Sequence, residues 1–207
     1  MNTCVVVPVR GIATGKSRLA GVLDASARAQ FTTWLLEHTL GAIGAWRGTL
    51  ASCIVVSTCA RVAELCRMRG TRVLDEEGAG GLNAAAALGV RRACALDASS
   101  VLVLACDLPL LDAAALERFA AAAAGSDIAI APDRTGRGTN AIMVRCGASF
   151  DFQFGEDSFA RHSEAAAARN LALAVHRDEA LAFDVDTPDD YARWLDLDGH
   201  GPRRPMV

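Results

Sequence analysis

Short apolar segments alternate with helix-like segments along the first two thirds of the chain, and this alternation constrains the fold more than any other feature. The expected strands are residues 3–9, 52–57, 71–74, 101–105 and 128–131. The segments between them carry apolar residues at helical spacing or are rich in alanine, and they are residues 25–45, 58–69, 82–96 and 112–124. Because the connections are short, the pattern predicts an α/β fold: a doubly wound, mostly parallel sheet with helices on both faces.

The alternation changes after Pro132, where a polar loop begins. The expected elements of this part are strands at 140–144, 172–177 and 181–185 and helices at 158–170 and 188–195. Thr187 and Pro188 are typical of the N-cap and the first position of a helix. We therefore expect a single domain over residues 1–195, followed by a loose tail over residues 196–207.

The composition of the 207-residue chain excludes several classes of protein. Hydrophobic residues make up 52% and charged residues 22%, so the chain can bury a core and is not disordered. A net charge of −3 argues against a broad basic surface for nucleic acid. No apolar run reaches the roughly 18–20 residues that a membrane helix needs, and the N-terminal segment lacks the pattern of a signal peptide. We expect a cytoplasmic protein without nucleic-acid or membrane partners.

The seven cysteines form an odd set in which no pair has CxxC spacing. Most of them lie in apolar segments, where cysteine packs as a small hydrophobic residue. We therefore expect neither a disulfide framework nor a zinc site, which suits a reducing compartment.

A loop with two glycines, residues 11–17, follows the first expected strand. Only three residues separate the glycines, whereas the Walker A loop needs four. A P-loop kinase, with Asp107 as its Walker B residue, remains an alternative. The loop also brings Arg10, Lys16 and Arg18 to the carboxyl end of a strand, where open α/β sheets bind ligands. Three cations there favour a polyphosphate ligand, although an ordinary solvated turn would also carry such charges.

Three aspartates stand where a ligand is expected. Asp107 directly follows the apolar strand at 101–105, and an unpaired carboxylate is costly there. Asp184 and Asp186 alternate with Val185, so an extended chain places both carboxylates on one face. Carboxylates that share a face repel each other unless a cation lies between them, and oxygen ligands suit Mg²⁺ or Mn²⁺. The alternative for Asp184 and Asp186 is a solvated strand end.

Five segments together resemble a known family. They are VVVPVRGIATGKSRL, ACDLPLL, GTNAIMV, FGEDSFARH and DVDTP, and they span nearly the whole chain in this order. The chain resembles the guanylyltransferases of coenzyme F-420 biosynthesis, in the nucleotide-diphospho-sugar transferase (MobA-like) superfamily. The resemblance implies transfer of GMP from GTP to phosphoenolpyruvate, 2-phospho-L-lactate or 3-phospho-D-glycerate. Pyrophosphate would be released, with Mg²⁺ or Mn²⁺ as cofactor.

The resemblance also implies a role for each candidate residue. The metal ligands would be Asp107, Asp184 and Asp186, and the contacts to the phospho-acid would be Thr139, Gly155 and Ser158. Lys16, catalytic together with Asp107, would lie at the triphosphate beside Arg10 and Arg18, and Gly81 and Asn83 would lie near the base. Two positions depart from the usual pattern, since Arg10 and Gly15 stand where many relatives have lysine and alanine.

Other functions stay open from the residues alone. Another MobA-like enzyme, acting on the molybdenum cofactor or a sugar phosphate, is one alternative, and a non-catalytic nucleotide-binding module is another. Neither the preferred acid nor the choice of GTP over ATP can be predicted from the residues. The next enzyme of the pathway and a second copy of the chain are the candidate protein partners.

Overall fold

A seven-stranded sheet forms the centre of the computed structural model, which describes residues 2–13, 15–75 and 80–197. The strand order is β3-β2-β1-β4-β6-β5-β7. The strands are β1 (Thr3–Pro8), β2 (Cys53–Val56), β3 (Arg72–Leu74), β4 (Ser100–Leu104), β5 (Ile128–Pro132), β6 (Thr139–Arg145) and β7 (Leu173–Val175). All neighbouring strands are parallel except at β6, which runs antiparallel to β4 and to β5. The predicted α/β fold with a mostly parallel sheet is confirmed.

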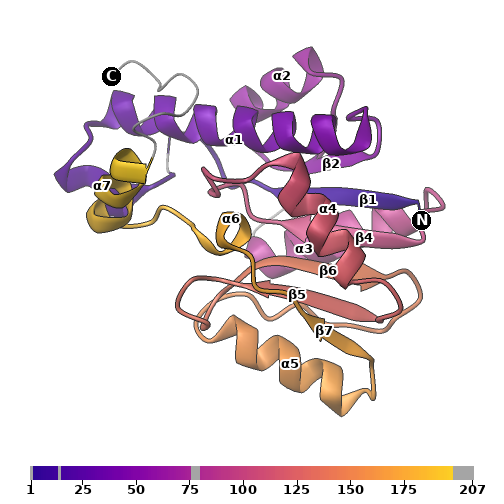
Figure 1. The fold of residues 1–207 in the computed structure, drawn as a ribbon. Coiled ribbons are helices and arrows are strands. Elements are labelled where there is room, and N and C mark those ends of the chain that lie inside the picture. The colour runs from indigo at the N-terminus through magenta and orange to yellow at the C-terminus, as the bar shows by residue number, and fades with distance from the viewer. Residues whose placement is uncertain (1, 14, 76–79, 198–207) are drawn as a thin grey trace.

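Helices cover both faces of this sheet (Figure 1). They are α1 (Ala25–Arg47), α2 (Ala60–Met68), α3 (Gly81–Cys94), α4 (Ala113–Ala122), α5 (Ser158–Ala168), α6 (Glu179–Ala182) and α7 (Pro188–Leu197), with a 3-10 helix η1 at Ser17–Gly21. Side chains of α1, α2, α4 and α6 share one core cluster with the sheet, and side chains of α3 and α5 share the other. A third cluster joins α7 and η1 to the start of α1.

Strand β1 shows why a continuous apolar run was a reliable sign of a central strand. Val5 and Val7 point into the core under α1, while Val6 points into the core under α3, and all three are fully buried. The strand therefore has no solvent-facing side, as expected for a parallel strand covered by helices on both faces.

The order of the strands creates a crevice between β1 and β4. The chain passes from β1 to β2 and β3 on one side, then returns to β4 on the other side of β1. Such a reversal leaves a gap beyond the carboxyl ends of the two strands, where open α/β sheets bind ligands. Because β6 is antiparallel to β4, its first residues, Thr139 and Asn140, lie at the same edge of the sheet.

The structure corrects two expectations. The predicted strand at 181–185 is a short helix, α6, followed by an extended segment, because the Asp178 side chain accepts hydrogen bonds from Ala180 N and Leu181 N and starts a helical turn. The expectation of no disulfide is also wrong. Cys94 at the end of α3 is bonded to Cys146 just after β6, which the spacing of 52 residues did not reveal.

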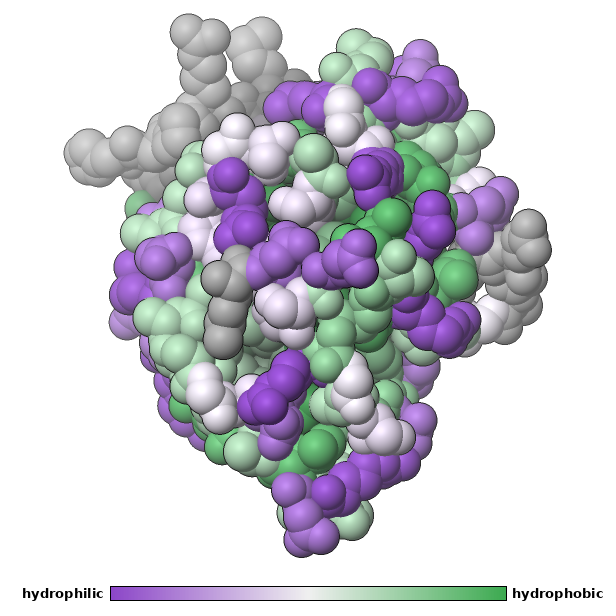
Figure 2. All heavy atoms as spheres, turned by 90° about the vertical axis from the view of Figure 1, so that its right-hand side faces the viewer, coloured by the Kyte–Doolittle hydropathy of each residue, from purple (hydrophilic) through white to green (hydrophobic). Residues whose placement is uncertain are grey.

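Helix α7 confirms the predicted start of the last helix, since the Thr187 hydroxyl accepts from Asp190 N. The helix extends to Leu197, and the rest of the expected tail lies outside the described residues. In the described part of the chain, no helix combines the length and the apolar character needed to cross a membrane. The face seen from the right-hand side of Figure 1, where the N-terminus lies, intermixes hydrophilic and hydrophobic residues (Figure 2).

Candidate active site

A cavity of about 250 Å³ opens at the crevice between β1 and β4. Its wall combines the end of β1, the first turns of α3, the end of β4 and the start of β6. The lining residues are Pro8, Val9, Arg10, Gly81, Leu82, Ala85, Val103, Leu104, Ala105, Cys106, Asp107, Thr139 and Phe154. Four of the predicted site residues, Arg10, Gly81, Asp107 and Thr139, therefore line one cavity.

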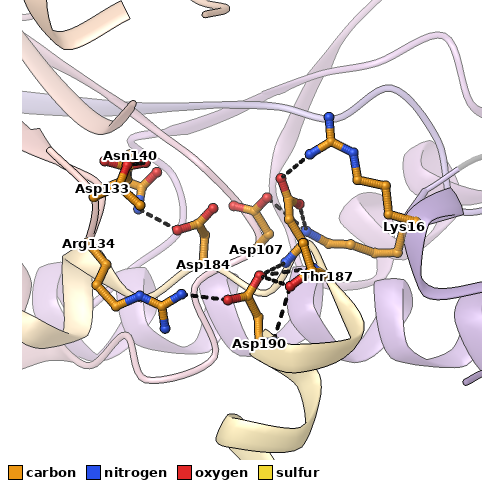
Figure 3. A network of polar contacts seen from close by, with 11 residues as sticks. Lys16, Asp107, Asp133, Arg134, Asn140, Asp184, Thr187 and Asp190 are labelled. Carbon is orange, nitrogen blue, oxygen red and sulfur yellow. Dashed lines mark hydrogen bonds and ion pairs between the residues drawn. The ribbon is translucent and has the colours of Figure 1, made fainter. Parts of the chain in front are cut away.

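Lys16 joins two of the predicted aspartates, and one of them, Asp107, lines this cavity (Figure 3). Its ammonium Nζ lies 2.9 Å from Asp107 Oδ2 and 2.9 Å from Asp186 Oδ1. Only 9% of the Lys16 side chain is exposed. Burial alone would lower the pKa of Lys16, but the two carboxylates outweigh it and raise that pKa above its usual range. Lys16 is therefore a permanent cation between residues that are 91 and 170 positions away in the chain.

A backbone contact brings the two acidic segments together. Val185 N donates a hydrogen bond to the carbonyl oxygen of Asp107, at 3.2 Å. The fully buried Val185 side chain anchors this extended segment in the cluster formed with α1 and α7. Asp184 and Asp186 therefore flank an anchored residue next to Asp107, as the alternation of the sequence predicted.

Asp107 and Asp186 each form an ion pair with Lys16. In the described part of the chain, Asp184 forms none with it. Burial raises its pKa to about 6, and the negative charges of Asp107 and Asp186 add to the effect. The amide Nδ2 of the buried Asn140 lies 3.5 Å from Asp184 Oδ1 and donates to the carbonyl oxygen of Leu181 at 3.0 Å. The cluster therefore holds more negative charge than Lys16 balances, as a cation site requires.

Asp190 supports the backbone of this cluster, a role that the sequence did not show. Its Oδ2 accepts from Asp186 N at 3.2 Å and from both the backbone and the hydroxyl of Thr187. Its Oδ1 accepts from Arg134 Nη2 at 2.6 Å. Asp190 thus links the β5–β6 loop to the turn that carries Asp186 (Figure 3).

Of the three predicted phospho-acid contacts, Thr139 lines the cavity, whereas Ser158 and Gly155 are not among its lining residues. Thr139 is buried at the start of β6, and its Oγ1 lies 3.0 Å from His162 Nδ1 on α5. Ser158 is the first residue of α5 and is also buried. Gly155, with a φ of +125°, adopts a backbone conformation that side-chain-bearing residues rarely take. The Gly155 turn is adjacent to Phe154, which lines the cavity.

Asn83 lies next to the cavity-lining Gly81 and Leu82, and its side-chain amide contacts the loop before Gly155. Its Oδ1 accepts from Phe154 N at 2.6 Å, and its Nδ2 donates to Phe154 O at 3.4 Å. These two hydrogen bonds connect the first turn of α3 with the loop that carries Gly155. The sequence could not show a contact between residues 71 positions apart.

The two other cations of the first loop, Arg10 and Arg18, reach different parts of this site. Arg10 lines the cavity, and its guanidinium faces Gly81 at the start of α3. The Arg18 side chain is 74% exposed, and its Nη1 lies 3.8 Å from Asp186 Oδ2. Gly15 sits against α1, where an added Cβ would lie 2.9 Å from Thr32 Oγ1, so the chain has little room for a side chain at this position. Thr14 of this loop lies outside the described residues.

The chemistry of the cluster fits a hard divalent cation. Asp107, Asp184 and Asp186 offer carboxylate oxygens, the ligands that Mg²⁺ prefers. Within residues 2–13, 15–75 and 80–197, no three acidic, histidine or cysteine side chains stand close enough to hold a metal ion by themselves. Mg²⁺ in nucleotide-binding proteins is typically held by one or two carboxylates together with substrate phosphates, and this cluster can supply that share.

Solved structures show the class of fold to which this site belongs. A protein from Desulfovibrio desulfuricans G20, assigned as a nucleotide-diphospho-sugar transferase, has the same fold, with a TM-score of 0.81 at 16% sequence identity. The match covers 97% of this chain and 89% of that one. The chain therefore has the fold of a nucleotidyltransferase.

The family is more specific than the fold. Residues 3–203 match the family model described as "Guanylyl transferase CofC like". The chain is 39% identical over 202 residues to a phosphoenolpyruvate guanylyltransferase of Sphaerobacter thermophilus, covering 98% of this chain and 95% of the relative. It is 35% identical over 188 residues to a 3-phospho-D-glycerate guanylyltransferase of Phenylobacterium zucineum, covering 89% and 86%. The chain belongs to the CofC-like guanylyltransferase family, which confirms the resemblance and excludes a P-loop kinase.

Proposed function

We propose that this guanylyltransferase transfers GMP from GTP to the phosphate of phosphoenolpyruvate, as a step of coenzyme F-420 biosynthesis. One observation carries the proposal. A cation-bearing loop and three aspartates converge at the crevice between β1 and β4. They lie beside a pocket that is lined by Thr139 among other residues. Phosphoenolpyruvate is the first choice because the relative at 39% identity is a phosphoenolpyruvate guanylyltransferase.

The reaction exchanges one phosphoanhydride linkage for another. A phosphate oxygen of the acid attacks the α-phosphorus of GTP, and the bond between that phosphorus and the oxygen bridging to the β-phosphate breaks. The bond electrons leave with pyrophosphate, and the product is a guanosine diphosphate linked to the acid. No protein nucleophile is needed, so the protein contributes positioning and charge stabilisation.

The main obstacle is repulsion between two anionic substrates. Lys16, buried between Asp107 and Asp186, supplies a fixed positive charge beside the cavity-lining Asp107. Arg10 and Arg18 extend this positive charge to either side and would contact the triphosphate oxygens that become the leaving pyrophosphate. Asp190 supports this arrangement by holding the Asp186 backbone through its N–H.

We propose that Asp107, Asp184 and Asp186 hold Mg²⁺ or Mn²⁺ together with the substrate phosphates. A bound divalent cation would neutralise the charge of the phosphate oxygens that it touches. The protein's own share is to hold the segment of Asp184 and Asp186 next to Asp107, through the hydrogen bond from Val185 N to Asp107 O and the contact of Asn140 with Asp184.

The phospho-acid and the guanine base of GTP would occupy opposite sides of the cavity. Thr139, Ser158 and the backbone at Gly155 would hold the phosphate of the acid, since the N-terminus of α5 favours an anion. The start of α3, at Gly81, would lie near the guanine. Asn83 would act there through its contact with Phe154, because both ends of its amide are engaged.

A pyrophosphate-release assay tests the proposal directly. The protein is incubated with Mg²⁺ and either GTP or ATP, and with phosphoenolpyruvate, 3-phospho-D-glycerate or 2-phospho-L-lactate in turn. We expect turnover with GTP and phosphoenolpyruvate, and mass spectrometry should detect the guanosine-diphosphate-linked acid. Turnover with another of these acids alone would refute the substrate, and absence of turnover with all of them would refute the proposed reaction.

A further inference from the structure

His162 is the most deeply buried titratable side chain on the acid side of the cavity. It lies on α5 and is 0% exposed. Its ring lies among three phenylalanines and is nearly perpendicular to Phe154, with the ring centres 4.9 Å apart. Phe154 itself lines the cavity.

Both ring nitrogens of His162 have partners, and one of them fixes where the proton resides. The backbone N–H of Gln153 lies 2.9 Å from Nε2 and can only donate, so Nε2 carries no proton. A neutral imidazole then carries its proton on Nδ1, which lies 3.0 Å from Thr139 Oγ1. The imidazole therefore donates to the Thr139 hydroxyl, and that hydroxyl accepts.

Because the Thr139 hydroxyl accepts from His162 Nδ1, its own proton must be donated to an acceptor other than the imidazole. Among the described residues, Oγ1 of Thr139 has a hydrogen bond with His162 alone. Thr139 lines the cavity, so we infer that the acceptor of this proton is a ligand in the cavity. A phosphate or carboxylate presents only acceptor oxygens when it is fully ionised, so a hydroxyl that must donate is the matching partner.

We propose that His162 is a positioning residue that holds the Thr139 hydroxyl as a hydrogen-bond donor toward an anionic group of the phospho-acid. The inference rests on the proposed function for the identity of the ligand. The donor orientation itself follows from the Gln153–His162–Thr139 chain of hydrogen bonds. Burial also lowers the pKa of His162 to about 4, so the ring stays neutral at ordinary pH and keeps this orientation.

Two variants separate the two contacts of the ring. In His162→Asn the amide nitrogen can take the place of Nδ1 and still donate to Thr139, while the acceptor for Gln153 is lost. In His162→Gln the amide oxygen can take the place of Nε2 and accept from Gln153, while the donor to Thr139 is lost. A role in packing alone would affect both variants in the same way.

The experiment measures KM for phosphoenolpyruvate and for GTP by pyrophosphate release. We expect His162→Gln to raise KM for phosphoenolpyruvate about tenfold, since a lost hydrogen bond to a charged group is worth about that factor. We expect His162→Asn to raise it severalfold less, and KM for GTP to change in neither. With Thr139→Val as background, the two variants should become indistinguishable. If His162→Gln and His162→Asn differ in KM for phosphoenolpyruvate by the same factor with Thr139→Val as with Thr139, the inference is overturned.

A second measurement needs neither activity nor a variant that folds. Nuclear magnetic resonance of protein labelled with ¹⁵N-histidine reports which ring nitrogen carries the proton. We expect His162 to carry it on Nδ1, and a proton on Nε2 would overturn the inference. This result is independent of whether the wild-type enzyme uses phosphoenolpyruvate, so failure of the proposed function and failure of the inference are distinguished.

Discussion

The buried His162 ring should make the free energy of unfolding depend on pH between about 4 and 6.5. Its pKa is about 4 in the folded protein, against 6.5 for an ordinary histidine, because burial disfavours the charged ring. In this range the unfolded chain binds a proton at residue 162 and the folded protein does not. Folding is therefore favoured as the pH rises, and the contribution is lost as the pH falls through this range.

The magnitude follows from the two pKa values. Their separation of about 2.5 pH units corresponds to at most about 3 kcal/mol of stability, and about 2 kcal/mol of this should be lost between pH 7 and pH 5. The ring is 0% exposed, so solvent screening does not reduce this figure.

Urea denaturation of the wild type and of His162→Gln at several pH values provides the assay. The three tryptophans give the fluorescence signal. Other groups titrate in this range, among them Asp184 with its raised pKa, but they are common to both proteins. The difference in free energy of unfolding between the two proteins should therefore shrink by about 2 kcal/mol from pH 7 to pH 5. A difference that stays constant with pH would refute the reasoning.

Three further changes test the site and the core. Asp107→Asn should lower kcat by about a hundredfold or more while the circular dichroism spectrum stays unchanged, and near-normal turnover with Mg²⁺ would remove Asp107 from the catalytic centre. Lys16→Met should raise KM for GTP and lower kcat in the pyrophosphate assay, because the buried ammonium between Asp107 and Asp186 is lost; unchanged kinetics would show that Lys16 does not act on the triphosphate. Gly89→Ala on α3 would place a Cβ 2.3 Å from Val6 Cγ1 of β1, so it should destabilise the fold by about 1–3 kcal/mol in urea denaturation. Val6→Ala in the same chain should restore part of that loss, and an unaffected Gly89→Ala would contradict the close packing of α3 on the sheet.

The sequence predicted most of the strands and the main acidic cluster. The strands β1 and β4 are buried on both faces. A strand of this kind consists almost entirely of apolar residues, so it can be recognised in the sequence. Asp107 was placed at the carboxyl end of a strand, and Asp184 and Asp186 on one face of an extended segment, by local spacing alone. These features depend on neighbouring residues, so a single sequence is sufficient to find them.

Contacts between distant residues were not predictable in the same way. Asp190, Asn140 and His162 act through partners 23 to 56 residues away, and nothing in their surroundings marks those partners. The antiparallel direction of β6 did leave a signal that we did not use. Only residues 133–138 separate β5 from β6, and a connection that short joins antiparallel strands, since a parallel crossover needs a dozen residues or more.

The paired hydrogen bonds between Asn83 and Phe154 have a thermodynamic consequence. They join the turn that starts α3 to the loop before Gly155, so ordering one segment restricts the other. If each substrate orders its own segment, the first to bind bears part of the entropic cost of the second, which makes their affinities interdependent. Such linkage is reciprocal: whatever factor GTP adds to the affinity of the acid, the acid must add to the affinity of GTP.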